Sequence, residues 1–156
     1  MIIKSKKAFS MVTAIFVIII MATVTSLIMN VTGKTLKETT QQYQKEQAAL
    51  LARSYTEQAI LYALHYERTA DCVNEINATF GSVDNLYRIQ TVIQYAGNES
   101  QLPIPGCETI ARWVDTGTLR FQASISLIVD VYVSYQDFDD PQRRDVTFHR
   151  RTLQKL

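Results

Sequence analysis

Charged residues are absent from a long N-terminal stretch that runs from Ala8 to Gly33. Proline is absent before Pro103, and Gly33 is the only glycine before Gly81. Because proline and glycine are the residues that most strongly interrupt helices, one continuous helix can run through this stretch and beyond it. At ~1.5 Å per residue, the uncharged stretch alone makes a helix of about 39 Å, longer than the roughly 30 Å hydrocarbon core of a bilayer. It therefore predicts a transmembrane segment.

This segment lacks the features of a cleavable secretory signal peptide. Such a peptide has an apolar core of about 7–15 residues followed by a small-x-small cleavage site. The apolar stretch here is longer, and no A-x-A site follows Leu27. The basic residues Lys4, Lys6 and Lys7 precede it, so the positive-inside rule predicts a cytoplasmic N-terminus and a C-terminal domain on the opposite side. A retained single-pass membrane segment is the expected topology.

The sequence has only two cysteines, Cys72 and Cys107, and both follow the membrane segment. An even number outside the cytoplasm favours one disulfide, which would contribute about 3–4 kcal/mol in the chain-entropy model. Two unrelated buried thiols are the alternative. Neither cysteine has a Cys or His at metal-ligand spacing, so no zinc site is predicted.

Catalytic signatures are missing as well. The chain contains no GxSxG, HExxH, P-loop or CxxC motif, and His65 and His149 each stand alone in their segments. No enzyme activity, catalytic residue, cofactor or metal site is predicted. The carboxylates of Asp137, Asp139 and Asp140 leave a Ca²⁺ loop as an alternative, but DFDDP lacks a glycine pivot and a distal Glu, so a solvated acidic turn is favoured.

The formal net charge is only +1, which gives no general affinity for nucleic acid. A basic cluster near the C-terminus is interleaved with acids and has no alternating aromatic residues, so nucleic-acid binding is not expected. Its members are Arg143, Arg144, His149, Arg150, Arg151 and Lys155. Asn77 and Asn98 begin N-x-S/T sequons, which leave a glycan open.

Past the membrane segment, apolar and small residues recur at helical spacing. They form one stripe that needs cover from the rest of the chain, because an isolated amphipathic helix gains little by forming alone. The stripe comprises Ala48, Leu51, Ala52, Tyr55, Ala59, Tyr62, Ala63 and Tyr66. Residues 34–47 carry few large apolar side chains and are predicted to be a polar connector within a helix that runs from Phe9 to about Glu67.

The second half of the chain changes to the two-residue period of strands. Residues 87–95 alternate, with Tyr87, Ile89, Thr91, Ile93 and Tyr95 on the expected inner face. Residues 119–135 read as a longer strand with an apolar face, and the apolar outer residue Ile128 suggests a bulge. A turn at residues 137–145 leads into a closing strand that starts with Val146, Phe148 and Arg150.

Residues 67–86 and 97–117 are interpreted as loops. Two or three antiparallel strands would then lie on the helical stripe. The predicted fold is α+β: a long N-terminal helix, with a membrane half and an amphipathic half, packed on a small antiparallel sheet.

The order of Lys6, Lys7, a small residue Ala8, Phe9 and an uncharged helix with an amphipathic continuation resembles the N-terminus of type IV pilins and pseudopilins. The resemblance implies that a prepilin peptidase cuts between Ala8 and Phe9 and methylates the amine of Phe9. It implies a cytoplasmic leader over residues 1–8, a transmembrane helix half over 9–33, an extramembrane half over 34–67, and a loop and sheet region over 68–156.

By the same resemblance, the mature protein sits in the inner membrane with its globular domain in the periplasm. Its expected partners are membrane lipid, the prepilin peptidase, other pilin or pseudopilin subunits and the inner-membrane assembly platform. The expected function is a minor pilin or pseudopilin of a type IV pilus, type II secretion or DNA-uptake filament. The alternative from another class is a single-pass membrane-anchored periplasmic sensor or adaptor.

The chain departs from the family pattern at two positions. Ala8 stands where the family usually has glycine, and Thr13 occupies the fifth mature position, where shaft-forming pilins carry a glutamate that pairs with a neighbour's N-terminal amine. A buried carboxylate is costly to leave unpaired, so a subunit without it has less need of a partner above it. Thr13 therefore suggests a place at or near the filament tip and a role in priming assembly.

Overall fold

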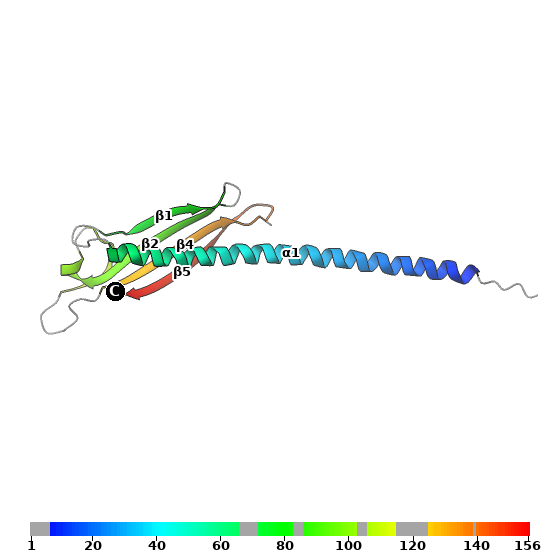
Figure 1. Ribbon diagram of the computed structural model, residues 1–156, viewed down its shortest axis with the longest axis horizontal. Coiled ribbons are helices and arrows are strands. Elements are labelled where there is room, and N and C mark those ends of the chain that lie inside the picture. The colour runs from blue at the N-terminus through cyan, green and yellow to red at the C-terminus, as the bar shows by residue number, and fades with distance from the viewer. Residues whose placement is uncertain (1–6, 66–71, 83–85, 103–105, 115–124, 139) are drawn as a thin grey trace, which may run out of the picture. The chain divides into compact units, whose positions relative to one another are not determined.

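The structure is a computed structural model that describes residues 7–65, 72–82, 86–102, 106–114, 125–138 and 140–156, with side chains from residue 11 onward. The chain divides into two units, Met1–Gln42 and Tyr43–Leu156. A single helix, α1 (Lys7–His65), contributes residues to both units, and the described strands all belong to the second (Figure 1). The helix bounds agree with the expected helix, whose last predicted residues, 66 and 67, lie outside the described chain.

The second unit contains a five-stranded sheet in the order β1-β2-β4-β5, with β3 paired to β2. The central strand β2 pairs with β4 along one edge, while β1 and then β3 share the other edge. All pairs are antiparallel except β2 with β3, which is parallel. A short 3-10 helix, η1 (Glu99–Gln101), follows β2. The strands are β1 (Glu75–Phe80), β2 (Tyr87–Asn98), β3 (Thr109–Trp113), β4 (Ser126–Gln136) and β5 (Asp145–Lys155).

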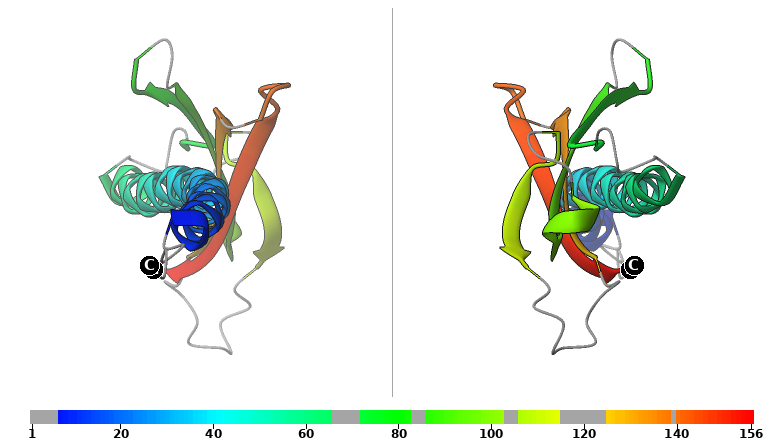
Figure 2. Two further views of the ribbon diagram at one scale, coloured as in Figure 1. Left: turned by 90° about the vertical axis from the view of Figure 1, so that its right-hand side faces the viewer. Right: turned by 90° about the vertical axis from the view of Figure 1, so that its left-hand side faces the viewer.

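One face of this sheet, called here the inner face, packs against the part of α1 that lies in the second unit (Figure 2). The helix presents small side chains to it, with Ala48, Ala52 and Ala59 fully buried and Ala63 1% exposed. Small residues let a helix backbone approach a sheet closely, so the large side chains of the core come from the strands. In β2, the buried side chains of the inner face are the five predicted to face inward, from Tyr87 to Tyr95 in alternation. In β4 and the residue just before it, the buried side chains of the inner face are Ile125, Leu127, Val129, Val131, Val133 and Tyr135.

The α+β fold, the alternation of β2 and β4, and the β4–β5 hairpin are therefore confirmed. Residues 119–124 of the predicted long strand lie outside the described residues. The bulge expected at Ile128 is wrong, because the register of β4 with both neighbours is continuous across that residue. Ile128 instead lies opposite Leu153 of β5, so its apolar side chain has a cross-strand partner on the outer face.

The two segments interpreted as loops contain strands, which corrects that prediction. In β1, only Ile76 and Ala78 are partly buried against the core, and the other residues are exposed, as suits an edge strand with few apolar side chains. β3 pairs in parallel with a later part of β2, beyond the residues that pair with β1. It is joined to the sheet mainly by backbone hydrogen bonds to β2. Neither strand shows a strong apolar alternation, so the pattern that identified β2 and β4 was missing.

The helical stripe needs a correction too. Tyr62 is 44% exposed, whereas Gln44 and Thr56, which the stripe omitted, are buried. Threonine can be buried at position 56 because its hydroxyl donates to the Ala52 carbonyl at 2.7 Å. Leu51 and Tyr55 are partly buried against the core as expected, and Tyr66 lies outside the described residues.

Candidate functional site

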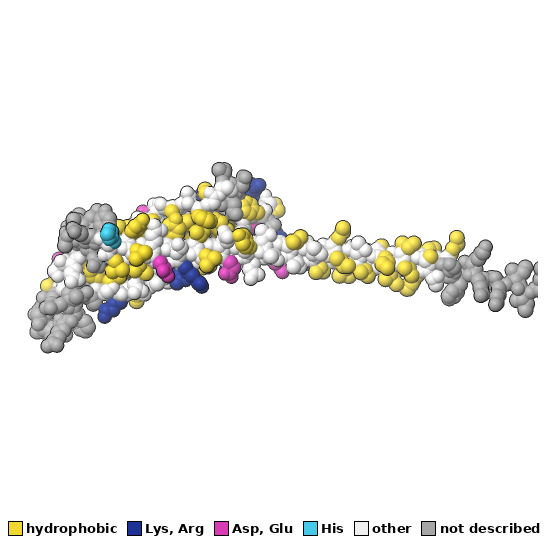
Figure 3. Space-filling model, viewed as in Figure 1, with side chains coloured by type: hydrophobic (Ala, Val, Ile, Leu, Met, Phe, Trp, Pro, Cys, Tyr) yellow, Lys and Arg dark blue, Asp and Glu magenta, His cyan; other side chains and the backbone are white. Residues whose placement is uncertain are grey.

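The apolar segment of α1 is the first functional feature, because its own unit leaves it uncovered. Its large apolar side chains from Met11 to Val31 are exposed, none of them by less than the 46% of Ile20. Mean hydropathy reaches 2.6 over a window in which no residue is buried, and the helix is long and apolar enough to cross a membrane. Yellow side chains lie along this segment in Figure 3.

Several polar residues of this segment form side-chain hydrogen bonds within the helix. Thr25 donates to the Met21 carbonyl at 2.8 Å, and Thr32 donates to the Ile28 carbonyl at 2.9 Å. Asn30 reaches the Ser26 carbonyl at 3.4 Å. A hydroxyl or amide that bonds back one turn does not present an unpaired donor to hydrocarbon, so these residues are compatible with a lipid environment.

The residues assigned to processing lie at the start of this helix. Lys6 is outside the described residues, and Lys7, Ala8 and Phe9 form the first positions of α1. The bond between Ala8 and Phe9 therefore falls within the first helical turn, and their side chains are not described. Thr13, at the position where the resemblance to pilins leads one to expect a glutamate, is exposed on the helix.

The disulfide predicted between Cys72 and Cys107 is present, with a Cα–Cα distance of 4.8 Å. Asn74 reinforces it by bridging the two segments that it joins. Its amide nitrogen donates to the Gly106 carbonyl at 2.9 Å, and its side-chain oxygen accepts from the Glu108 backbone N–H at 2.8 Å. The crosslinked region is thus held together by the hydrogen bonds of the Asn74 side chain as well as by the disulfide. The sequence carried no signal for the role of Asn74.

A second cluster that sequence reasoning missed surrounds Asp130 on the outer face of the sheet, opposite α1. Asp130 is 4% exposed and accepts from Nε and Nη2 of Arg151, each at 2.8 Å. Nε2 of His149 lies 2.7 Å from the same carboxylate, and its ring stacks on Tyr132 with a centroid distance of 4.5 Å. Hydrogen bonds from Arg151, and secondarily from His149, lower the pKa of Asp130 against the opposing effect of burial. His149 stands alone in sequence, and only strand pairing brings it to Asp130.

An ion pair between Asp140 and Arg144 joins the acidic turn to the basic cluster. Asp140 accepts from Arg144 Nε at 2.6 Å and from the Gln142 backbone N–H at 3.0 Å, and the Arg144 bond lowers the pKa of Asp140. Asp139 lies outside the described residues. Among the described residues, no group of three or more His, Cys, Asp or Glu side chains is placed to hold a metal ion. His65, at the end of α1, is exposed.

The two sequons differ in exposure. Asn77 lies exposed on β1, whereas Asn98 is 5% exposed and caps η1 by accepting from the Ser100 backbone N–H at 3.0 Å. A buried capping amide is not accessible for modification, so Asn98 is a structural residue. Asn77 is the more accessible of the two sequons.

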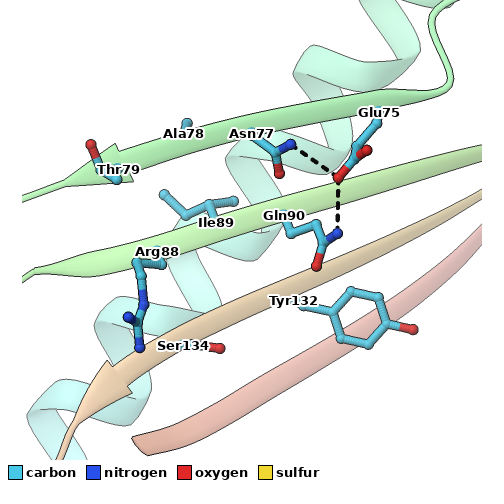
Figure 4. Close-up of a pocket in the computed structure, with 9 residues that line it drawn as sticks. All are labelled: Glu75, Asn77, Ala78, Thr79, Arg88, Ile89, Gln90, Tyr132 and Ser134. Carbon is cyan, nitrogen blue, oxygen red and sulfur yellow. Dashed lines mark hydrogen bonds between the residues drawn. The ribbon is translucent and has the colours of Figure 1, made fainter.

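The outer face also carries a hollow of about 680 Å³ over β1, β2 and β4. Figure 4 shows α1 behind the strands, so the hollow opens on the side of the sheet away from the helix. Glu75 lies at one end of the hollow and accepts from Gln90 Nε2 at 2.8 Å and from Asn77 Nδ2 at 3.0 Å. Sequence reasoning did not find it, because its residues belong to a segment interpreted as a loop and to the outer positions of two strands.

Comparisons of the chain with protein-family models, with curated proteins and with solved structures find no match. Its function is therefore argued from its own residues.

Proposed function

We propose that the protein is a minor pilin or pseudopilin, a structural subunit of a type IV pilus, type II secretion or DNA-uptake filament. One observation carries the proposal: a basic leader, a small residue and Phe9 lead directly into an uncharged helix that continues, without a break in α1, into a stripe packed on a sheet. A plain membrane anchor needs neither the leader pattern nor the continuity of the helix into the globular unit.

The exposed apolar segment supplies the physical reason for assembly. In the membrane, lipid covers its side chains. When a subunit leaves the bilayer, only other apolar helices can replace that cover, and close van der Waals packing between helices offsets the lost lipid contacts. Threonines bonded back to their own helix can enter such packing without leaving unpaired groups.

Thr13 favours a place at or near the tip within this proposal. The uncharged side chain cannot form the ion pair that a glutamate makes with the N-terminal amine of a neighbour. A subunit that lacks this pair can begin a filament without a partner above it. Its copy number relative to the major subunit tests this point, because a protein as abundant as the shaft subunit cannot be confined to the tip.

Co-expression with a prepilin peptidase tests the function directly. We expect the full chain to lose residues 1–8 and to carry an N-methyl group on Phe9, as read by intact mass and N-terminal peptide mass spectrometry. An intact leader in the presence of active peptidase would contradict the proposal and favour the membrane-anchored sensor or adaptor.

A matched pair of variants makes the result specific. Ala8→Leu places a large side chain at the bond to be cut and should leave the chain uncut. Ala14→Leu makes the same change within the apolar segment and should be processed as fully as the wild type. Equal processing of both variants would mean that cleavage does not occur after Ala8.

A further inference from the structure

The hollow on the outer face is built from side chains that both donate and accept hydrogen bonds. Glu75, Asn77 and Thr79 project from β1, because alternate residues of a strand share one face. Arg88 and Gln90 come from β2, and Tyr132 and Ser134 come from β4. The hollow thus offers a carboxylate, two amides, two hydroxyls, a guanidinium and a phenol on three adjacent strands (Figure 4).

The amides are held in fixed orientations. Gln90 and Asn77 both use their NH₂ groups on one oxygen of Glu75, so the carbonyl oxygen of each planar amide is directed away from that carboxylate. Acceptors fixed in this way are organised before a ligand arrives, which reduces the conformational entropy lost on binding.

Tyr132 is also held in place. Its ring stacks on His149 with an interplanar angle of 9°, and His149 is bonded to the buried Asp130. Arg151 holds Asp130 with two further bonds. A rigid aromatic side chain next to polar groups is a common element of sites that bind ligands with both C–H and O–H surfaces.

The charge of the hollow argues against anionic ligands. Hydrogen bonds from Gln90 and Asn77 lower the pKa of Glu75, so its carboxylate is ionised at neutral pH. The guanidinium of Arg88 forms an ion pair with Asp145. With the cation compensated and the carboxylate charged, phosphate and other anions are repelled. The surface that lines the hollow is polar and apolar in similar measure, which suits a ligand with both C–H and O–H surfaces.

We propose that this hollow is a binding site for a neutral, polyhydroxylated ligand, a short hexose or N-acetylhexosamine oligosaccharide. Vicinal hydroxyls each donate and accept, which matches paired amide and carboxylate oxygens beside the hydroxyls of Thr79 and Ser134. Its volume lies within the ~300–1,000 Å³ range of small-ligand pockets. The site belongs to the folded second unit and does not depend on N-terminal processing, so this inference and the proposed function can fail separately.

The test uses the full chain in lipid nanodiscs, because sugar-based detergents would compete. A panel of short neutral hexose and N-acetylhexosamine oligosaccharides is screened, and bound members are titrated by NMR. We expect saturable binding with shifts at Gln90 and Tyr132. Gln90→Leu should weaken it at least ~10-fold, since it removes one fixed polar partner and releases Glu75. Glu75→Gln, which preserves shape, should weaken it as well.

Gln94→Leu is the matched control. Gln94 lies on the same strand and face and donates to Glu108 at 3.2 Å, but it does not line the hollow. It should bind the oligosaccharide as the wild type does, with unfolding temperatures confirming that each variant is folded. The proposal is overturned if no neutral oligosaccharide binds at millimolar concentration. It is equally overturned if Gln90→Leu and Gln94→Leu lose binding alike, or if a phosphorylated oligosaccharide binds more tightly than the neutral one.

Discussion

Two regions of α1 share one helix but differ in what covers them. From Met11 to Val31 the helix carries large branched and sulfur-containing side chains, and they are exposed. From Ala48 to Ala63 it turns a face of small residues toward the sheet, and that face is buried. One continuous helix thus has a region of exposed apolar side chains and a region whose small side chains are buried against the sheet.

The difference shows where each region obtains its stability. The alanine face is completed by β2 and β4 of the same chain, whose large side chains fill the space that the alanines leave. The apolar segment has no such cover among the described residues; lipid, or other subunits in the proposed filament, would cover its side chains. Changes in one region should therefore affect folding of the second unit, and changes in the other should affect insertion and assembly.

Loss of the disulfide should have the largest effect, and only on the second unit. Cys72→Ser with Cys107→Ser should lower the free energy of unfolding of that unit by about 3–4 kcal/mol. Chemical denaturation followed by the fluorescence of Trp113 measures it. The fraction of chains in the membrane should not change, and if it fell in parallel with stability, the two regions would not be independent.

A charge in the apolar segment should impair membrane insertion and leave the stability of the second unit unchanged. Ile18→Arg places a cation at a position 67% exposed on the helix and should cost about 2.5–3.5 kcal/mol of insertion free energy at the centre of the segment. The fraction resistant to alkaline carbonate extraction measures it. Leu50→Arg is the control, since Leu50 is similarly exposed, at 61%, but lies in the second unit. Equal losses in both variants would contradict a membrane role for Ile18.

The same substitution, alanine to leucine, compares how closely the two regions of α1 are packed. Ala52→Leu adds volume at a fully buried position and should lower the free energy of unfolding by about 1–3 kcal/mol, because the sheet cannot move away without losing contacts. Ala22→Leu adds the same volume at an exposed position and should change it by less than about 0.5 kcal/mol. Thermal unfolding in nanodiscs measures both. A neutral Ala52→Leu would mean that the helix and sheet are not closely packed.

Lowering the pH should reduce the stability of the second unit by protonating Asp130. Because Arg151 lowers its pKa in the folded state, the stabilisation from this carboxylate is complete above the unfolded pKa of about 3.9 and is lost as pH falls through the lower folded value. Asp130→Asn should therefore lower the free energy of unfolding by about 1–2 kcal/mol at neutral pH, and the difference should shrink below about pH 4. Denaturation of both proteins across this range measures it, and a difference that grows as pH falls would contradict the assignment. The uncharged apolar segment has no group to titrate there.

Features with strong local periodicity could be predicted from the sequence. The long helix followed from missing proline and glycine, and β2 and β4 followed from strict alternation of apolar residues. The disulfide followed from cysteine number and predicted topology. Each of these signals lies within one segment, or depends on compartment alone.

The missed features depend on contacts between segments. β1 and β3 are edge strands with little apolar alternation, and their pairing with β2 is made by backbone groups that every residue carries. The partners in the Asp130 cluster and the Glu75 hollow come from neighbouring strands, so only the register brings them together. Tyr62 was misplaced because helical spacing locates a face without defining its edge, which depends on the width of the sheet beneath it.

The central claim is that the apolar segment is retained after its basic leader is removed and then packs against other subunits. Intact mass spectrometry of the protein from native cells, separated into membrane and sheared filament fractions, tests it most directly. We predict a polypeptide of residues 9–156 with one added methyl group that is present in the filament fraction. Recovery of residues 1–156 alone, confined to the membrane fraction, would contradict the account.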